Sequence, residues 1–263
     1  MHGKELATRE GNILEGKVAL ITGAGSGVGR AMANLFANNG AKVIVVDVVP
    51  ERVKEVVEEI GNKRATGMVK DLSSKTEPEK MIDDALSSER RIDILCNNAG
   101  IMDGVKPVAE VDDGLWERVI NINLNAPFRA SRRVIPAMLK QDGGKGVIIN
   151  TASIAGMFGG VAGAPYTVSK HGLIGLTKSI AASYGDKGIR CNAMVLGAVK
   201  TQIGLGGGNP SQLGLAMMQK KSASMPRLAE PIEIAKLALF LASEDSGYIN
   251  GSCIVIDNGW TVY

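Results

Sequence analysis

The chain has 263 residues, of which 45% are hydrophobic and 22% charged, a composition typical of globular proteins. Its net charge of +3 comes without a long basic run, which argues against a nucleic-acid partner. No apolar stretch reaches the roughly 18 residues that a membrane span needs, and the polar start lacks the apolar core of a signal peptide.

The cysteines and histidines argue against a metal centre. Cys96, Cys191 and Cys253 each lie in apolar, strand-like runs without metal-ligand spacing, so we expect buried, reduced thiols. Reduced thiols predict a cytoplasmic location. The only histidines are His2 and His171, so no metal site is expected.

A glycine-rich turn follows the first predicted strand, 17–22, and opens a predicted helix at 30–38. Glycines let the backbone approach a ligand closely, and free N–H groups at a helix start attract anions, as a pyrophosphate site requires. The spacing Gly-x-x-x-Gly-x-Gly over 23–29 differs from the Gly-x-Gly-x-x-Gly fingerprint. A plain tight turn is the alternative.

Asp47 ends the second predicted strand, 42–46. An acidic residue at this place would accept hydrogen bonds from the ribose hydroxyls of a dinucleotide. The alternative is that Asp47 caps the following helix, 51–60. A third strand is predicted at 65–70, a helix at 76–88, and a fourth strand at 92–96.

This alternation predicts an α/β fold of the Rossmann type: a doubly wound parallel β-sheet of about seven strands with helices on both faces. No linker or repeat interrupts the chain, so we expect a polar tail over 1–13 and a single domain over 14–263. A long helix is predicted at 112–140. Asn123 in its middle is a poor helix-interior residue, which predicts a bend or a functional role.

The stretch 147–170 carries the clearest chemical signal. A buried strand ends at Ser153, and a helix begins near Pro165. Tyr166 and Lys170 are four residues apart and share one face of this helix. A cation beside a phenol lowers its pKa, so we expect Tyr166 to exchange a proton near neutral pH. Alone, the pair is common by chance, and a serine is more often a turn residue.

The last third of the chain is predicted to contain a strand at 189–195, a helix at 232–242 and a strand at 252–256. A loose glycine-rich segment and a short methionine-bearing helix lie between the first two. We interpret 200–228 as a substrate lid over an apolar pocket. An ordinary surface connection is the alternative.

Taken together, these motifs resemble one family. They are Thr22-Gly23-x-x-x-Gly27-x-Gly29, Asp71-Leu72, Asn97-Asn98-Ala99-Gly100, Asn123, Ser153, Tyr166-x-x-x-Lys170 and Asp257-Asn258-Gly259. In order and spacing, the chain resembles the short-chain dehydrogenase/reductase family over 14–259. Archaeal-type alcohol dehydrogenases and 3-oxoacyl-carrier-protein reductases are the most similar members.

The resemblance implies four catalytic roles. Tyr166 would be the acid/base, and Ser153 would hold the substrate oxygen. Lys170 would bind the nicotinamide ribose and lower the pKa of Tyr166. Asn123 would hold a water that continues the proton relay.

The resemblance also implies the residues that bind the cofactor. They are Gly23, Ser26, Gly27, Val28, Gly29, Asp47, Val48, Asp71, Leu72, Asn98, Ala99, Gly100, Tyr166, Lys170, Gly197, Val199 and Thr201. Asp47 would repel a 2′-phosphate, so the expected cofactor is NAD(H). Leu196 stands where the family usually has a proline, so the loop beside the nicotinamide is expected to be less rigid. The expected substrate pocket consists of Ser153, Met102, Met157, Phe158, Leu196 and Met217.

The sequence therefore predicts an NAD-dependent oxidoreductase that transfers a hydride between nicotinamide and a secondary alcohol or ketone. A 3-oxoacyl thioester reductase, a sugar dehydrogenase, and an epimerase or dehydratase that keeps NAD bound are alternatives. A non-catalytic dinucleotide-sensing protein is the alternative from another class. The family implies a homotetramer, and Trp260 and Tyr263 would otherwise be exposed aromatic residues at the chain end.

Overall fold

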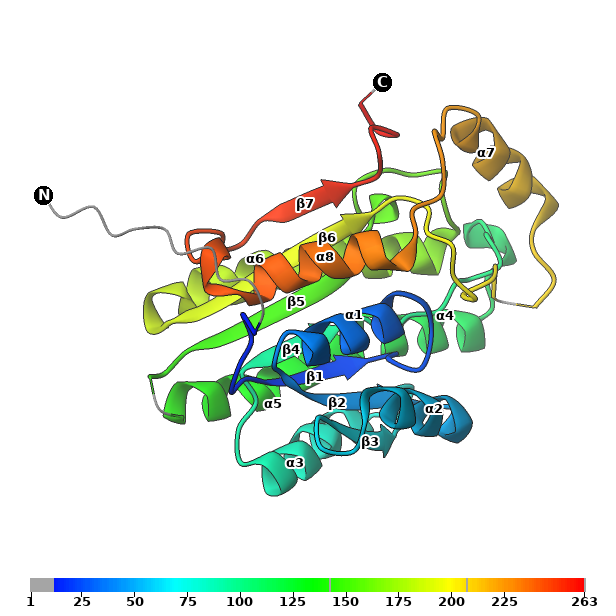
Figure 1. Cartoon of the computed structure of the whole chain (residues 1–263). Helices are drawn as coiled ribbons and strands as arrows, with labels where there is room; N and C mark the ends of the chain where they lie inside the picture. Colours follow the sequence, from blue (N-terminus) through cyan, green and yellow to red (C-terminus); the bar gives the residue numbers. More distant parts are fainter. Residues whose placement is uncertain (1–11, 142, 207, 263) are drawn as a thin grey trace, which may run out of the picture.

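The computed structural model describes residues 12–141, 143–206 and 208–262, and in this part of the chain seven parallel strands form one sheet (Figure 1). The strand order is β3-β2-β1-β4-β5-β6-β7, which confirms the predicted Rossmann-type sheet. The strands are β1 (Val18–Thr22), β2 (Lys42–Asp47), β3 (Ala65–Val69), β4 (Ile94–Asn97), β5 (Gly146–Ser153), β6 (Ile189–Leu196) and β7 (Cys253–Ile256). The order reverses between β1 and β4, where open α/β sheets bind ligands at the carboxyl ends of their strands.

Helices cover both faces of the sheet (Figure 1). One apolar cluster joins it to α1 (Gly27–Asn38), α2 (Pro50–Ile60) and α8 (Pro231–Ala242). A second joins it to α3 (Glu77–Glu89), α5 (Ala126–Lys140) and α6 (Ala164–Tyr184). Strands that are buried on both sides carry continuous apolar runs, which is why they could be predicted from the sequence.

The predicted long helix 112–140 is interrupted. It consists of α4 (Asp113–Ile120), a π-helical segment (Asn121–Asn125) and α5. Asn123 lies fully buried in the π-helical segment. A π-helical turn of this kind is frequent at functional sites, so the helix is interrupted where Asn123 stands.

The segment 200–228, here called the lid segment, contains α7 (Gln212–Ser222), which stands beyond the carboxyl ends of the strands (Figure 1). Two backbone hydrogen bonds tie it to the loop that follows β4. The Gly104 N–H donates to the Leu205 carbonyl at 2.7 Å, and the Ser211 N–H donates to the Gly104 carbonyl at 2.9 Å. The lid segment is therefore anchored to the loop after β4.

The end of the chain corrects one prediction. Trp260 is only 6% exposed, and its indole N–H donates to the Lys221 carbonyl at 3.0 Å. Trp260 therefore packs inside its own chain and needs no partner subunit to bury it. Tyr263, and all of the predicted tail except Asn12 and Ile13, lie outside the described residues.

The described residues contain no helix long and apolar enough to cross a membrane, and no group of three or more potential metal ligands. Cys96 and Cys191 are buried, and Cys253 is partly buried. Burial raises the pKa of the Cys191 thiol to about 12, which keeps it protonated and unreactive at neutral pH.

Candidate active site

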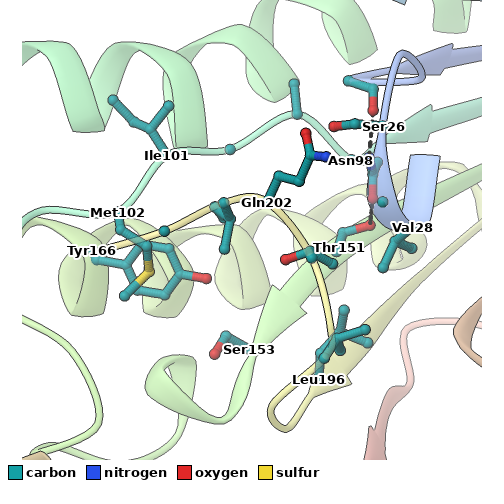
Figure 2. Close-up of a pocket in the computed structure, with 18 of the residues that line it drawn as sticks. Ser26, Val28, Asn98, Ile101, Met102, Thr151, Ser153, Tyr166, Leu196 and Gln202 are labelled. Carbon is teal, nitrogen blue, oxygen red and sulfur yellow. Dashed lines mark hydrogen bonds between the residues drawn. The ribbon is translucent and has the colours of Figure 1, made fainter. Parts of the chain in front are cut away.

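A cavity of about 660 Å³ opens where the strand order reverses (Figure 2). Its walls come from the carboxyl ends of β2, β4, β5 and β6, the loop after β1, and the lid segment. Segments far apart in the sequence therefore converge on one space large enough for two small molecules side by side.

The glycine turn forms one end of the cavity. Gly23, Ser26, Gly27 and Val28 line it, while Gly29 lies behind them. A Cβ on Gly29 would lie 2.1 Å from the Gly23 carbonyl oxygen, so only glycine allows the turn to pack this tightly. The turn leads directly into α1, so its free N–H groups can receive a pyrophosphate.

Asp47 lines the cavity and holds the glycine turn in place. It is 8% exposed; its Oδ2 accepts from the Gly25 N–H at 3.0 Å and its Oδ1 from the Val49 N–H at 3.1 Å. No side-chain cap is formed at the start of α2, so the alternative role of Asp47 as a helix cap is not observed. Val48, beside it, is 58% exposed at the cavity rim.

Arg52, which the sequence reasoning left out of the site, lies across from Asp47. A Cβ on Gly25 would lie 2.7 Å from the Arg52 Cβ and 2.8 Å from the Asp47 Cγ, so the two side chains flank the same turn. The Arg52 guanidinium donates to the Gln202 side chain at 3.3 Å. This contact links α2 to the lid segment over the cavity.

Asp71, Leu72, Asn98, Ala99 and Gly100 also line the cavity, as expected for cofactor residues. Thr22 organises this region. Its hydroxyl oxygen accepts from the N–H groups of Asn98 and Ala99, each at 3.0 Å, and its hydroxyl donates to the Cys96 carbonyl at 3.3 Å. The ends of β1 and β4 are thereby held together.

Ser153, Tyr166 and Lys170 converge on the other half of the cavity. Figure 2 shows the hydroxyls of Ser153 and Tyr166 facing the same space. The Lys170 ammonium lies 5.3 Å from the centroid of the Tyr166 ring and donates to the Thr151 carbonyl at 2.8 Å. A phenol, a hydroxyl and a largely buried ammonium therefore meet at this end of the cavity.

Burial shifts the pKa values of Tyr166 and Lys170, and the shift of Tyr166 differs from the expected one. Burial raises the pKa of Tyr166 to about 12; Ser153 lowers it and the charge of Asp103 raises it further. Burial also lowers the pKa of Lys170 to about 8. The expected lowering of the Tyr166 pKa is wrong for this structure, because burial outweighs the hydrogen bond with Ser153, the one recorded cause that lowers it.

Asn123 does not line the cavity, and its side chain is fully engaged. Its Oδ1 accepts from the Ile101 N–H at 2.9 Å, and its amide donates to the Ile101 carbonyl at 2.9 Å and to the Ser169 hydroxyl at 3.2 Å. Ile101 itself lines the cavity. The side chain of Asn123 thus fixes the loop after β4, and the relay water remains a prediction.

Gly197, Val199 and Thr201 line the cavity beyond the end of β6. Leu196, which stands where the family usually has a proline, lines the cavity as well. The Gly197 N–H donates to the Ile256 carbonyl at 3.1 Å. The Lys200 N–H donates to the Ala229 carbonyl, and the Ala229 N–H donates to the Ala198 carbonyl, each at 2.9 Å. These bonds hold the loop after β6, and its lower rigidity stays a prediction.

The substrate end of the cavity differs from the predicted set. Ser153, Met102 and Leu196 line it, as do side chains that were not predicted: Val161, Met218, Met225 and Trp260. Met157 and Met217 lie outside it, 44% and 42% exposed. Phe158 packs beside the Trp260 cluster with the Lys221 ammonium 5.3 Å above its ring. The rotation of α7, which sequence alone does not set, turns Met218 inward in place of Met217.

Comparisons with known proteins agree with this geometry. A family model described as Enoyl-(Acyl carrier protein) reductase matches residues 23–261. The chain is 40% identical over 258 residues to a 3beta-hydroxysteroid dehydrogenase 2 of Eggerthella lenta, covering 97% of this chain and 98% of the relative. It is 39% identical over 256 residues to a cyclohexanol dehydrogenase of an Acinetobacter species, covering 95% and 97%.

A solved structure is also similar. It is described as an NAD(P) dependent gluconate 5-dehydrogenase from Beutenbergia cavernae with NADP bound at low occupancy; the TM-score is 0.83, the identity 35%, and the coverage 96% of this chain and 100% of that chain. These matches span nearly the whole chain. The chain belongs to the short-chain dehydrogenase/reductase family, whose members are dinucleotide-binding oxidoreductases acting on hydroxyl and carbonyl groups.

Proposed function

We propose that this chain is an NAD-dependent dehydrogenase that interconverts secondary alcohols and ketones, with Tyr166 as the acid/base. The observation that carries the proposal is the single cavity that joins Ser153, Tyr166 and Lys170 to the glycine turn and Asp47. The tight turn before α1 fits a bound dinucleotide, because its backbone can approach a pyrophosphate closely. When bound, the nicotinamide would exchange a hydride with the carbinol carbon.

Side chains of the protein would transfer the proton to or from the substrate oxygen. Ser153 would hold the substrate oxygen beside the phenol of Tyr166. A phenol with a pKa of about 12 stays protonated at neutral pH, so it can donate to a carbonyl that gains a hydride. Alcohol oxidation needs the phenolate, so oxidation should accelerate as the pH rises. Lys170, mostly charged at neutral pH, would stabilise that phenolate once a ligand has settled beside it.

The preference for NAD(H) over NADP(H) rests on Asp47. Its carboxylate lines the cavity at the end of β2, where a 2′-phosphate would bring a second negative charge. Two unit charges ~4 Å apart interact by about 4 kcal/mol at an effective dielectric of 20. After solvent screening, ~2–3 kcal/mol would still give about a 100-fold preference. Arg52, which also lines the cavity, is a cation that could oppose this effect, and its guanidinium is hydrogen-bonded to Gln202.

The cofactor test is kcat/KM for NADH against NADPH with one ketone. We expect about a 100-fold preference for NADH, which Asp47→Ser should erode by admitting the phosphate. Arg52→Ala is the matched control: if Arg52 only holds Gln202, the preference persists. Parity in the wild-type protein, or a preference for NADPH that Arg52→Ala abolishes, would contradict the assignment.

For the substrate, we propose an alicyclic secondary alcohol. Two relatives are named for such substrates, a 3β-hydroxysteroid and cyclohexanol. The apolar lining by Met102, Met218, Met225 and Trp260 supports the same class, because methionines adapt to a bulky ring. A panel of cyclohexanol, a 3β-hydroxysteroid, sugar alcohols and 3-hydroxyacyl thioesters should give the highest kcat/KM with the ring alcohols. Preference for sugars or thioesters would refute this substrate class and leave the chemistry standing.

We further propose a cytoplasmic homotetramer, as the family resemblance implies. Trp116 on α4, Phe128 on α5 and Val168 on α6 are each at least 40% exposed, as is Val255 on the edge strand β7. Such apolar side chains on the surface favour a partner subunit. Light scattering at micromolar concentration should show four chains per particle, and a stable monomer would refute the proposal.

A further inference from the structure

Asp103 is a fully buried carboxylate in the loop after β4, and three backbone N–H groups converge on it. Its Oδ1 accepts from Val105 at 3.0 Å and from Gly163 at 3.1 Å, and its Oδ2 accepts from Tyr166 at 2.9 Å. Ionised carboxylates that accept several backbone N–H groups form strong hydrogen bonds. No sequence motif drew attention to this residue.

Two of these N–H groups belong to the start of α6, the helix that carries Tyr166. Gly163 is its N-cap residue and has no side chain to satisfy the exposed N–H groups. Asp103 supplies the missing acceptor from 63 residues before Tyr166. A negative charge at a helix N-terminus also interacts favourably with the helix dipole. The backbone of Tyr166 is therefore held directly by Asp103.

The other side of the same loop holds the lid segment. Gly104, next to Asp103, makes both backbone bonds to Leu205 and Ser211. A Cβ on Gly214, in the first turn of α7, would lie 1.7 Å from the Val105 carbonyl oxygen, so helix and loop are in close contact. Asp103 thus lies between the lid segment and the helix of Tyr166.

Val105 adds a sign of strain. Its φ is +55°, in the left-handed region that β-branched residues rarely adopt. Such a conformation costs energy and persists only where the surroundings enforce it, most often near functional sites. The bond from the Val105 N–H to Asp103 is one of the contacts that enforce it.

We propose that Asp103 is a positioning residue that fixes Tyr166 in the cavity and couples it to the lid segment. The inference rests on the proposed function, in which Tyr166 is the acid/base. The part of the lid segment that contacts Gly104 and Val105, and the helix that places the phenol, would then share one anchor.

The charge of Asp103 gives a readout that a purely structural cap would not. This charge raises the pKa of Tyr166. The other charged group recorded close to the phenol in the described residues is Lys170, and Ser153 at the end of β5 is neutral. Neutralising Asp103 should therefore make the phenol easier to ionise.

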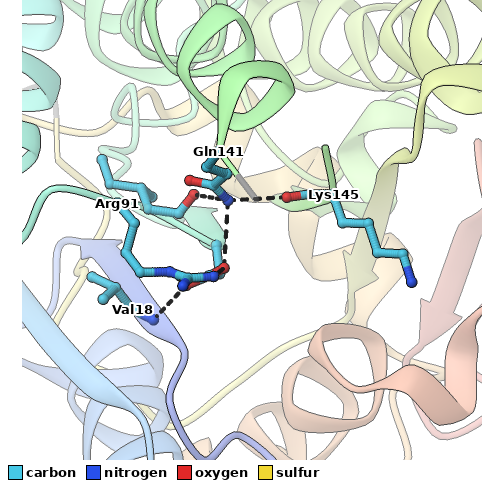
Figure 3. Close-up of polar contacts among 6 residues, drawn as sticks. Val18, Arg91, Gln141 and Lys145 are labelled. Atoms are coloured by element: carbon cyan, nitrogen blue, oxygen red, sulfur yellow. Dashed lines mark hydrogen bonds and ion pairs between the residues drawn. The ribbon is translucent and has the colours of Figure 1, made fainter. Parts of the chain in front are cut away.

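The test compares Asp103→Asn with Asp93→Asn. Asp93 is also a buried aspartate, 6% exposed, that accepts a backbone N–H, from Val18 at 2.9 Å. It lies at the amino end of the sheet, is hydrogen-bonded to Arg91 and Gln141, whose side chains are labelled in Figure 3, and does not line the cavity. In both variants the amide keeps the shape of the side chain and replaces an acceptor oxygen by a donor.

For Asp103→Asn we expect kcat to fall about 10–100-fold, because small misplacements of a reacting group are costly. The dissociation constant for NADH should stay unchanged, and the alkaline rise of alcohol oxidation should move to lower pH. Asp93→Asn should lower Tm and leave kcat and the pH profile as in the wild type. An Asp103→Asn variant with a lower Tm but with the kcat and the pH profile of the wild type would overturn the inference.

Hydrogen exchange separates this inference from the proposed function. Amides of 163–170 and 208–214 should exchange faster in Asp103→Asn than in Asp93→Asn, whether or not the protein turns over an alcohol. A wild-type protein without turnover would refute the proposed function, while unchanged exchange would refute the anchor. If Asp103→Asn does not fold, Asp103→Ser, which is shorter and can still accept an N–H, is measured in the same ways.

Discussion

Two buried charges lie at opposite ends of the same sheet, and they differ in the partners that surround them. At the amino end, Asp93 forms a two-point pair with Arg91, at 2.6 and 2.9 Å, and accepts the Val18 N–H (Figure 3). At the carboxyl end, Lys170 is 3% exposed, and its hydrogen-bond partner in the described residues is the neutral Thr151 carbonyl.

The difference separates stability from chemistry. A buried charge with an opposite partner is compensated, whereas a buried charge that faces only a neutral group is held at a cost in stability. The lowered pKa of Lys170 reflects that cost. The amino end of the sheet therefore holds strands together, and the carboxyl end keeps groups ready for a ligand.

The largest expected effect is on turnover at the carboxyl end. Tyr166→Phe removes the proton donor, so kcat should fall about 10²–10⁴-fold while NADH still binds. Tyr184→Phe, at the other end of α6, is the matched control and should retain wild-type kcat. Steady-state kinetics with one ketone measure both variants. Near-wild-type turnover by the Tyr166 variant would show that Tyr166 is not the proton donor, and the carboxyl end of the sheet would lose its assigned chemical role.

The next effect is on stability at the amino end. Arg91→Met leaves the Asp93 carboxylate buried without this cation, so the free energy of unfolding should drop by about 2–3 kcal/mol. Urea unfolding measures the loss, and kcat should be unchanged because the cluster lies away from the cavity. An equally stable variant would show that the Arg91–Asp93 pair does not support the sheet.

The smallest effect has the opposite sign. Lys170→Met removes a buried cation whose pKa is about 8, against 10.5 when solvated, a difference of roughly 3 kcal/mol. Part of this is offset because the Thr151 carbonyl loses its donor, which costs ~1–2 kcal/mol. At pH 7 the free energy of unfolding of the variant should be about 1–2 kcal/mol higher than that of the wild type. Its NADH binding should be weaker and its turnover lower.

The pH dependence sharpens that prediction. Because the folded-state pKa of Lys170 is depressed, the unfolded chain binds more protons between about pH 8 and 10, and wild-type stability rises with pH in this window. The stability advantage of Lys170→Met should therefore shrink above pH 8. Tyr166 acts in the opposite sense from pH 10 upward, because its folded-state pKa is raised, so urea unfolding is compared between pH 7 and 10. An advantage that stays constant from pH 7 to 10 would mean that Lys170 has the same pKa in the folded and the unfolded chain, and so is not desolvated by folding.

The sequence by itself determined the element order, the parallel sheet and the grouping of Ser153, Tyr166 and Lys170. These follow from short-range patterns: apolar runs for strands buried on both faces, a glycine turn between strand and helix, and a four-residue spacing on one helix face. The resemblance to a family added roles to residues that these patterns had already placed together.

Only the tertiary structure decided what depends on distant contacts. The pKa of Tyr166 is raised by burial, which no local pattern reports. Asp103 reaches α6 from the loop after β4, and Trp260 is buried against the lid segment. Met218 faces the cavity in place of Met217, because the packing of α7 sets its rotation. Desolvation and long-range packing depend on the whole chain, so these features appear only once it has folded.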